Sequence, residues 1–277
     1  MELEFEAEQG VESVSRFHDV GHHLQHVVEH GALPLFVAFA ALAGKWRRGQ
    51  AHESHFAFVA QPFGHAGERF LDKCYHARTG RYFNHNVHSV RLLKTIAGTN
   101  LCLQTYNGII THCGEKTFLE YRPKPCPTFA DLDALVEQCY VDQNNIRDLR
   151  PSTLEGCVVR ISDIIAYVGK DRQDAARIKL RGVDDYDESP VVGKLNHQII
   201  YNVTHNIIKN SLGKDYLAMD EEVFEGIDAL RRENYEKIYK SDLVVDRIKV
   251  VQQMMTRMYG QFVEDLEAGR EDSVIYR

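Results

Sequence analysis

The sequence has little of several features that would assign it to a specialised class of protein. Its formal charge is −7 and no basic face is evident. General nucleic-acid binding is therefore unsupported, because it requires clustered Lys and Arg. The six cysteines are spread out with no CxxC pair. This spacing argues against a zinc knuckle or a dense disulfide framework, and it favours a reducing cytosol.

Long apolar runs are also missing. The longest, Ala32 to Gly44, is too short to span a bilayer. It also lacks the charged start, N-terminal placement and cleavage pattern of a signal peptide. We find no strand signal of any length, no repeat and no low-complexity tract. We therefore expect a mostly α-helical, cytoplasmic protein without a membrane partner, built as one large domain or two small ones.

Helical patterns account for most of the chain after residue 60. Proline in RPKPCPTFA at 122–130 predicts a loop, and the acidic run VDDYDES at 183–189 predicts a linker or a lid. Ser152 or Thr153 is the expected cap of the longest apolar helix. Apolar periodicity and turn signals predict helical segments within 68–74, 87–96, 98–116, 151–171, 195–212, 220–240 and 243–268.

Histidine is unusually frequent, with 14 in total and 11 of them among the first 88 residues. The spacing of His18, His22, His26 and His30 places four imidazoles along one stripe of a helix. Any pair four residues apart could hold a transition metal through neutral imidazoles. The alternative is a solvated polar face.

Two polar segments punctuated by glycine or amides stand out between apolar helices. They are PFGHAGE at 62–68, which contains His65, and YFNHNVHS at 82–89, which contains His85. We interpret them as one wall of an active site. A phosphate near His85 would be well placed, because the N-terminal end of a helix favours negative charge.

Asp163 interrupts the apolar helix that starts near Pro151. Asp is rarely buried unless it is paired or bound to a metal. Asp163 is therefore either a metal ligand or a member of an ion pair.

These segments occur in the order and spacing of a known family. The chain resembles the dGTPase-like HD-domain phosphohydrolases over roughly residues 62–277. The motifs that carry the resemblance are PFGHAGE at 62–68, FNHNVHSVRLL at 83–93, NLCLQTYNGIITH at 100–112, PSTLEGCVVRISDIIAYVGKD at 151–171 and NSLGKDYLAMDEEVFEGIDALRRENYEKIY at 210–239.

The resemblance implies an all-α fold, the HD-domain helical bundle, and a divalent metal such as Mn, Mg or Fe. It implies cleavage of a deoxynucleoside triphosphate at the α-phosphorus, which releases the nucleoside and inorganic triphosphate. Asp163 corresponds to the last metal ligand of the family, and His65 and His85 to the catalytic histidines that contact and protonate the phosphate chain. The implied substrate-binding residues are Asn86, Tyr167 and Asp171.

In the family, a His-Asp doublet that binds the metal normally stands just before PFGH. At the aligned positions this chain has Phe56 and Ala57 instead. One interpretation is that HDVGH at 18–22 supplies the doublet after an insertion, so that His18 and Asp19 join Asp163 at the metal. A second is that His30 acts as the first ligand and the doublet is absent. A third is that residues 1–61 are aberrant.

Three functional hypotheses follow. The chain is a metal-dependent deoxynucleoside triphosphate triphosphohydrolase, or a degenerate HD domain that binds a nucleotide or a paralogue without catalysis, or an HD phosphatase acting on a nucleoside monophosphate or another small phosphate ester. We expect an atypical N-terminal helical segment at 1–61, an HD-type core at 62–185 and a C-terminal helical region at 186–277 packed on the core. A homo-oligomer is a further expectation from the resemblance.

Overall fold

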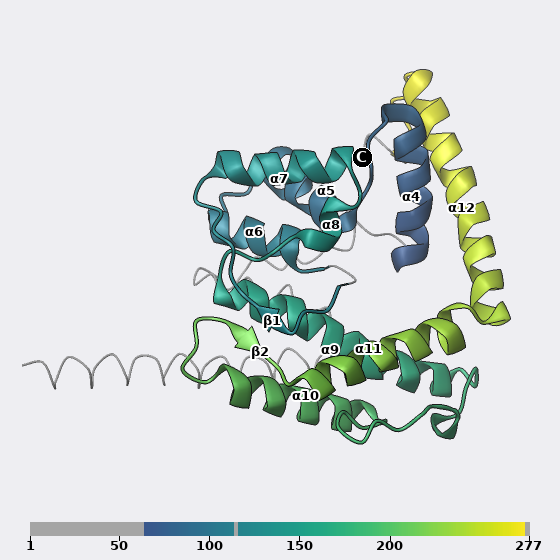
Figure 1. The fold of residues 1–277 in the computed structure, drawn as a ribbon. Helices are drawn as coiled ribbons and strands as arrows, with labels where there is room; N and C mark the ends of the chain where they lie inside the picture. Colours follow the sequence, from purple (N-terminus) through teal and green to yellow (C-terminus); the bar gives the residue numbers. More distant parts are fainter. Residues whose placement is uncertain (1–63, 114–115, 275–277) are drawn as a thin grey trace, which may run out of the picture.

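The computed structural model describes residues 64–113 and 116–274, and these residues form an all-α fold, as predicted (Figure 1). Two π-helical turns, Leu92–Ile96 and Tyr235–Tyr239, extend α5 and α11. The α-helices are α4 (Gly64–Thr79), α5 (His85–Arg91), α6 (Leu103–Thr111), α7 (Phe129–Val141), α8 (Asn145–Asp148), α9 (Leu154–Arg177), α10 (Asn196–Ser211), α11 (Glu221–Asn234) and α12 (Asp242–Glu267). Every helical segment predicted after residue 60 is confirmed.

Four features of the fold were not predicted: a short β ladder, helix α7, helix α8 and a 3₁₀ turn at Val183–Asp185. A two-residue antiparallel ladder pairs β1 (Glu120–Tyr121) with β2 (Leu217–Ala218), and two residues are too few to give a periodic signal. Helix α7 is the second feature. Its start carries a capping box in which Thr128 and Asp131 each bond the other's backbone N–H, at 3.2 and 3.0 Å.

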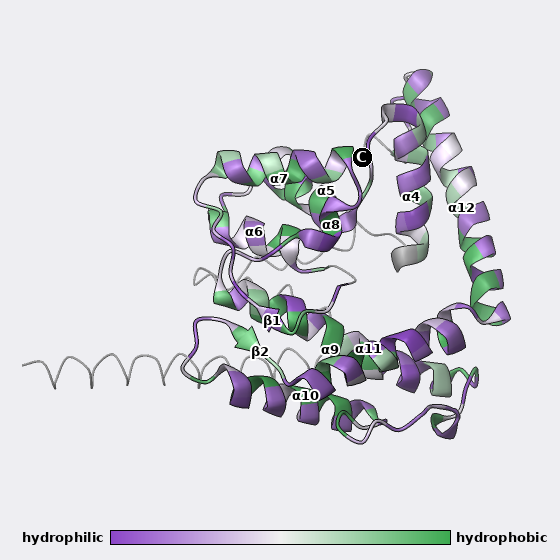
Figure 2. Ribbon diagram, in the orientation of Figure 1, coloured by the Kyte–Doolittle hydropathy of each residue, from purple (hydrophilic) through white to green (hydrophobic). Residues whose placement is uncertain are grey.

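Helix α9 is the central element of the larger hydrophobic core. Its N-cap is Thr153, whose Oγ1 accepts from the N–H of Gly156 at 3.1 Å, as the sequence predicted. Buried aliphatic residues of α9, among them Ile161 and Ile165, pack with residues of α10 and α11. Figure 2 shows hydrophobic and hydrophilic residues mixed along α10 and α11, as expected of helices that cover a core on one side.

This core joins elements from both sides of the predicted division at 185 and 186. The division into domains stays a prediction. A second hydrophobic cluster joins α5, α6 and α7 through residues such as Val87, Ile110 and Leu132. Helix α9 contacts both α6 and α10, and in Figure 1 it lies between the layer of α5, α6 and α7 and helix α10.

Helices α4 and α12 lie side by side (Figure 1), with Phe70 packed edge-on against Tyr259. Helix α4 is also tied to the start of α5, because Asp72 Oδ1 accepts from the N–H of Phe83 at 2.7 Å. Among the described residues, no helix combines the length and the apolar character needed to cross a bilayer.

Candidate active site

The first part of the candidate site is an ion pair between α4 and α5. Glu68 Oε1 lies 2.8 Å from His85 Nδ1 and accepts from the backbone N–H of His85 at the same distance. The two side chains are only 16% and 15% exposed. One carboxylate therefore fixes both the start of α5 and the orientation of the first imidazole on that helix.

The second part comes from the C-terminal end of α6. His112 Nε2 lies 3.3 Å from His85 Nε2, and His112 Nδ1 lies 2.7 Å from the carbonyl oxygen of Ile109. The Cys113 side chain follows directly, and its sulfur lies within 4.8 Å of a ring nitrogen of each histidine. The end of α6, a helix that is not adjacent to α4 in the chain, thus completes a small polar centre.

These contacts assign the ring protons. A carbonyl oxygen only accepts, so Nδ1 of His112 carries its hydrogen and Nε2 of His112 offers a lone pair. The carboxylate of Glu68 accepts from His85 Nδ1. A hydrogen bond between the two Nε2 atoms then has His85 Nε2 as its donor, and the Cys113 side chain is a second hydrogen-bond partner of His85. In this arrangement His85 carries a hydrogen on each ring nitrogen and is an imidazolium beside a neutral ring.

The electrostatic surroundings agree with this assignment. Burial acts to lower the pKa of His85, but Cys113 and Glu68 outweigh it and hold that pKa well above its ordinary value. Burial, followed by the charge on His85, lowers the pKa of His112 to about 4. Both shifts favour a charged His85 beside a neutral His112.

Arg160 connects this centre to helix α9. It is fully buried, and its Nη1 donates to the carbonyl oxygens of Thr111 at 2.8 Å and Cys113 at 2.6 Å. Burial lowers the pKa of Arg160, and the charge of Asp163, one turn further along α9, opposes that shift. Arg160 thus holds the end of α6 in place against α9.

The third part of the site is a stripe on α9. Asp163, Tyr167 and Asp171 are spaced by four residues, so they lie along one face of the helix. Tyr167 Oη accepts from Arg231 Nε at 2.9 Å, and Asp171 accepts from the Tyr239 hydroxyl. Burial raises the pKa of Tyr167 and, together with the neighbouring Asp171, that of Tyr239.

The predicted site residues fall into two groups. His85, Asp163, Tyr167 and Asp171 lie on α5 and α9 as described above, whereas Asn86 is completely buried and donates to the carbonyl oxygen of Ile110 at 2.5 Å. Their predicted roles in catalysis, metal binding and substrate binding stay predictions. His18, Asp19 and the rest of the histidine stripe lie outside the described residues, as do Phe56 and Ala57 and the side chain of His65.

Sequence reasoning did not single out five residues of this centre: Glu68, His112, Cys113, Arg160 and Arg231. Glu68 and His112 do fall inside the motifs at 62–68 and 100–112, so the motifs marked their segments without assigning them roles. Arg160 had a local signal, because a charged residue in an apolar helix must find partners. Arg231 lies in a charged surface helix and gave no signal.

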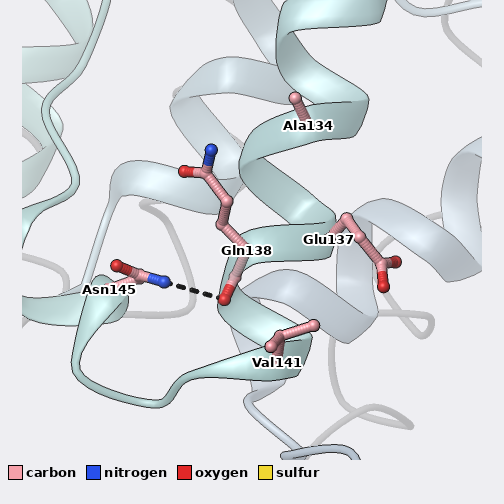
Figure 3. Close-up of a pocket in the computed structure, with 5 residues that line it drawn as sticks. All are labelled: Ala134, Glu137, Gln138, Val141 and Asn145. Atoms are coloured by element: carbon pink, nitrogen blue, oxygen red, sulfur yellow. Dashed lines mark hydrogen bonds between the residues drawn. The ribbon is translucent and has the colours of Figure 1, made fainter.

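A surface pocket lies elsewhere, between α7 and α8 (Figure 3). Asn145 Nδ2 donates there to the carbonyl oxygen of Gln138 at 2.8 Å. Glu137, which also lines it, forms an ion pair with Arg81 at 2.6 Å. The lining includes none of the predicted site residues, so we do not assign the chemistry to it.

Comparison with known proteins supports the resemblance seen in the motifs. No family model matches the sequence. The chain is 30% identical over 185 residues to a deoxyguanosinetriphosphate triphosphohydrolase-like protein of Caldanaerobacter subterraneus, an alignment that covers 64% of this chain and 43% of that protein. It is 24% identical over 225 residues to the protein of that name from Desulfatibacillum aliphaticivorans, covering 77% and 56% of the two chains.

A third relative of the same name, from Rhodopseudomonas palustris, is 34% identical over 154 residues, which cover 50% of this chain and 35% of the relative. The chain thus spans about half the length, or less, of the curated relatives it matches. The resemblance predicted from the motifs is confirmed, and the chain is homologous to the deoxyguanosinetriphosphate triphosphohydrolase-like proteins.

Proposed function

We propose that the chain hydrolyses a deoxynucleoside triphosphate to the deoxynucleoside and inorganic triphosphate, with His85 as the proton donor to the leaving oxygen. The observation that supports the proposal is the row Glu68, His85, His112, whose contact distances are those of a His85 ring with an N–H at Nε2. The names of the relatives support the substrate class.

The reaction needs a proton at one particular oxygen. Water attacks the α-phosphorus and gives up one proton to the surrounding solvent, the bond from phosphorus to the 5′ oxygen breaks, and the departing 5′ oxygen gains a proton. His85 Nε2–H supplies it, while Glu68 orients the ring and stabilises its charge before transfer. His112 holds that N–H between turnovers. A positioned donor of this kind contributes about 10²- to 10⁴-fold to the rate.

The α9 stripe would meet the triphosphate on another side. Arg231 is held by Tyr167 and also donates to Thr117 Oγ1 at 2.6 Å. A guanidinium fixed in this way is suited to the charge that develops on phosphoryl oxygens. We assign Tyr167 and Arg231 together to substrate positioning, with Asp171 beside them.

A divalent metal is part of the proposal because the motifs resemble those of the HD-domain phosphohydrolases. When bound, such an ion neutralises phosphoryl oxygens and lowers the pKa of a bound water. Of its three predicted ligands, only Asp163 lies within the described residues. Asp163 forms no group there with two further His, Cys, Asp or Glu ligands near enough to hold an ion. The described residues alone do not fit the family's metal, so we derive no step through it.

The test is product analysis with the full chain and each of the four deoxynucleoside triphosphates, with Mn²⁺, Mg²⁺ or Fe²⁺ added. Anion-exchange chromatography separates inorganic triphosphate from pyrophosphate and phosphate. We expect triphosphate and deoxynucleoside in equal amounts. His85→Asn should reduce turnover about 10²- to 10⁴-fold, and Glu68→Gln should reduce it less, because the imidazole remains. His205→Asn, at an exposed histidine of α10, is the matched control.

Each hypothesis gives a different result. Nucleotide-dependent thermal stabilisation without turnover would replace the proposal with a binding module. Release of phosphate from nucleoside monophosphates, with triphosphates untouched, would replace it with a phosphatase. Full turnover in His85→Asn would remove His85 from the mechanism.

A further inference from the structure

Three potential metal ligands from two helix ends converge on one point. One ring nitrogen each of His85 and His112 and the sulfur of Cys113 all lie within 4.8 Å of one another. They form the only such group of three among residues 64–113 and 116–274. None of the three corresponds to the metal ligands implied by the resemblance, which are His18, Asp19 and Asp163.

The separation of the two nitrogens suits a tetrahedral ion. With metal–nitrogen bonds of about 2.0–2.1 Å, the ligand atoms of a tetrahedral Zn²⁺ lie roughly 3.3 Å apart. The His85 and His112 Nε2 atoms are 3.3 Å apart. The same spacing serves as a hydrogen bond when the ion is replaced by a proton. Two imidazoles and a thiolate also form a donor set that binds Zn²⁺ and Co²⁺ in preference to Mg²⁺.

The other ring nitrogen of each histidine makes the hydrogen bond expected of a metal-ligating histidine. A ligating histidine normally donates its other ring N–H to a carboxylate or a backbone carbonyl, which fixes the ring. His85 Nδ1 has Glu68 as its partner, and His112 Nδ1 has the Ile109 carbonyl. Both rings therefore aim Nε2 at the shared point.

Arg160 fixes the backbone that carries the third ligand, Cys113. Arg160 donates to the carbonyl oxygen of Cys113 at 2.6 Å and to that of Thr111 at 2.8 Å. These bonds fix the backbone that carries both His112 and Cys113.

We propose that His85, His112 and Cys113 bind a transition-metal ion of borderline softness, which is Zn²⁺ in the cell. A fourth coordination position is left open. The metal takes the lone pair of the same His85 nitrogen that otherwise carries a proton. If the proposed function holds, a metal bound here would therefore remove the proton donor, and this consequence alone rests on that function.

The experiment measures binding and spectroscopy, so it needs no turnover. Full chain freed of metal with a chelator is titrated with Co²⁺ under reducing conditions. We expect a near-ultraviolet thiolate-to-cobalt charge-transfer band together with the intense visible bands of a four-coordinate ion, and loss of both when Zn²⁺ is added. The histidine-rich stretch before residue 64 cannot give the charge-transfer band, because the first cysteine of the chain is Cys74.

Variants assign the ligands. Cys113→Ser should abolish the charge-transfer band, and His112→Gln should weaken Co²⁺ and Zn²⁺ binding more than the roughly 10- to 100-fold expected for Glu68→Gln. Cys102→Ser, at an exposed cysteine at the start of α6, is the matched control and should keep the band. No charge-transfer band in the wild type, or a band that survives in Cys113→Ser, would overturn the proposal. Both results can be read whether or not the chain hydrolyses a nucleotide.

Discussion

The close approach of α9 and α10 at Gly169 gives a prediction whose magnitude follows from the structure. A Cβ added at Gly169 would lie 2.5 Å from Asn196 Oδ1, 2.8 Å from Asn196 Cα and 3.2 Å from Ile199 Cδ1. The side-chain amide can rotate away, but the Cα belongs to the first turn of α10. Gly169→Ala therefore requires the two helices to separate.

Overpacking of this kind costs about 1–3 kcal/mol, and a backbone contact places it near the upper end. Alanine recovers about 1 kcal/mol through its helix propensity. We expect a net loss of about 2 kcal/mol in the free energy of unfolding.

Gly260→Ala is the matched control, because Gly260 lies inside α12 and a Cβ there meets nothing within 4 Å. The control should gain up to about 1 kcal/mol from propensity alone. Urea denaturation followed by circular dichroism measures both variants, compared by their midpoints at equal slope. If Gly169→Ala were as stable as Gly260→Ala, α9 would not be the tightly packed support that we describe.

Three further predictions concern His88, Thr153 and Arg231. Burial, and then the charge of Arg91, lowers the pKa of His88 from 6.5 to about 4 in the folded chain. As the pH falls, the unfolded chain therefore protonates His88 before the folded chain does. The stability that is present above pH 6.5 is lost as the pH falls towards 4. His88→Gln should therefore remove about 2 kcal/mol of the loss between pH 7 and pH 5 in urea denaturation, and His205→Gln should not. Thr153→Ala should lower the free energy of unfolding by about 1 kcal/mol through loss of the α9 cap, with an unchanged denaturation slope as the check on two-state behaviour. Arg231→Gln should raise the KM for a deoxynucleoside triphosphate, and its melting temperature checks that the fold is kept. An unchanged KM would remove Arg231 from substrate positioning.

Local signals were sufficient to predict most of the helices. Thr153 as a cap and the apolar run after it located α9, and the stripe of Asp163, Tyr167 and Asp171 follows from helical spacing alone. Helix α7 had an equally local signal in Thr128 and Asp131, which the proline-rich loop before it obscured. Two-residue strands have no signal of their own, because the pairing energy comes from the partner.

The centre of the site could not be predicted in the same way. Glu68 and His85 are separated by 17 positions, and Arg160 and Thr111 by 49. Such pairs form only when helices pack, and no periodicity within one helix indicates them. The family motifs marked His85, but the proton assignment depends on contacts with Glu68 and with His112 that only the fold supplies.

The protonation states of His85 and His112 test the account most directly. Long-range imidazole ¹H–¹⁵N correlation spectra at pH 7.5, assigned with His85→Asn and His112→Gln, report the proton on each ring nitrogen. We predict that His85 carries hydrogens on both nitrogens and that His112 carries one, on Nδ1. In the chain freed of metal, a neutral His85 would contradict the proton donor, and a His112 protonated at Nε2 would contradict the orientation of the rings on which both proposals rest.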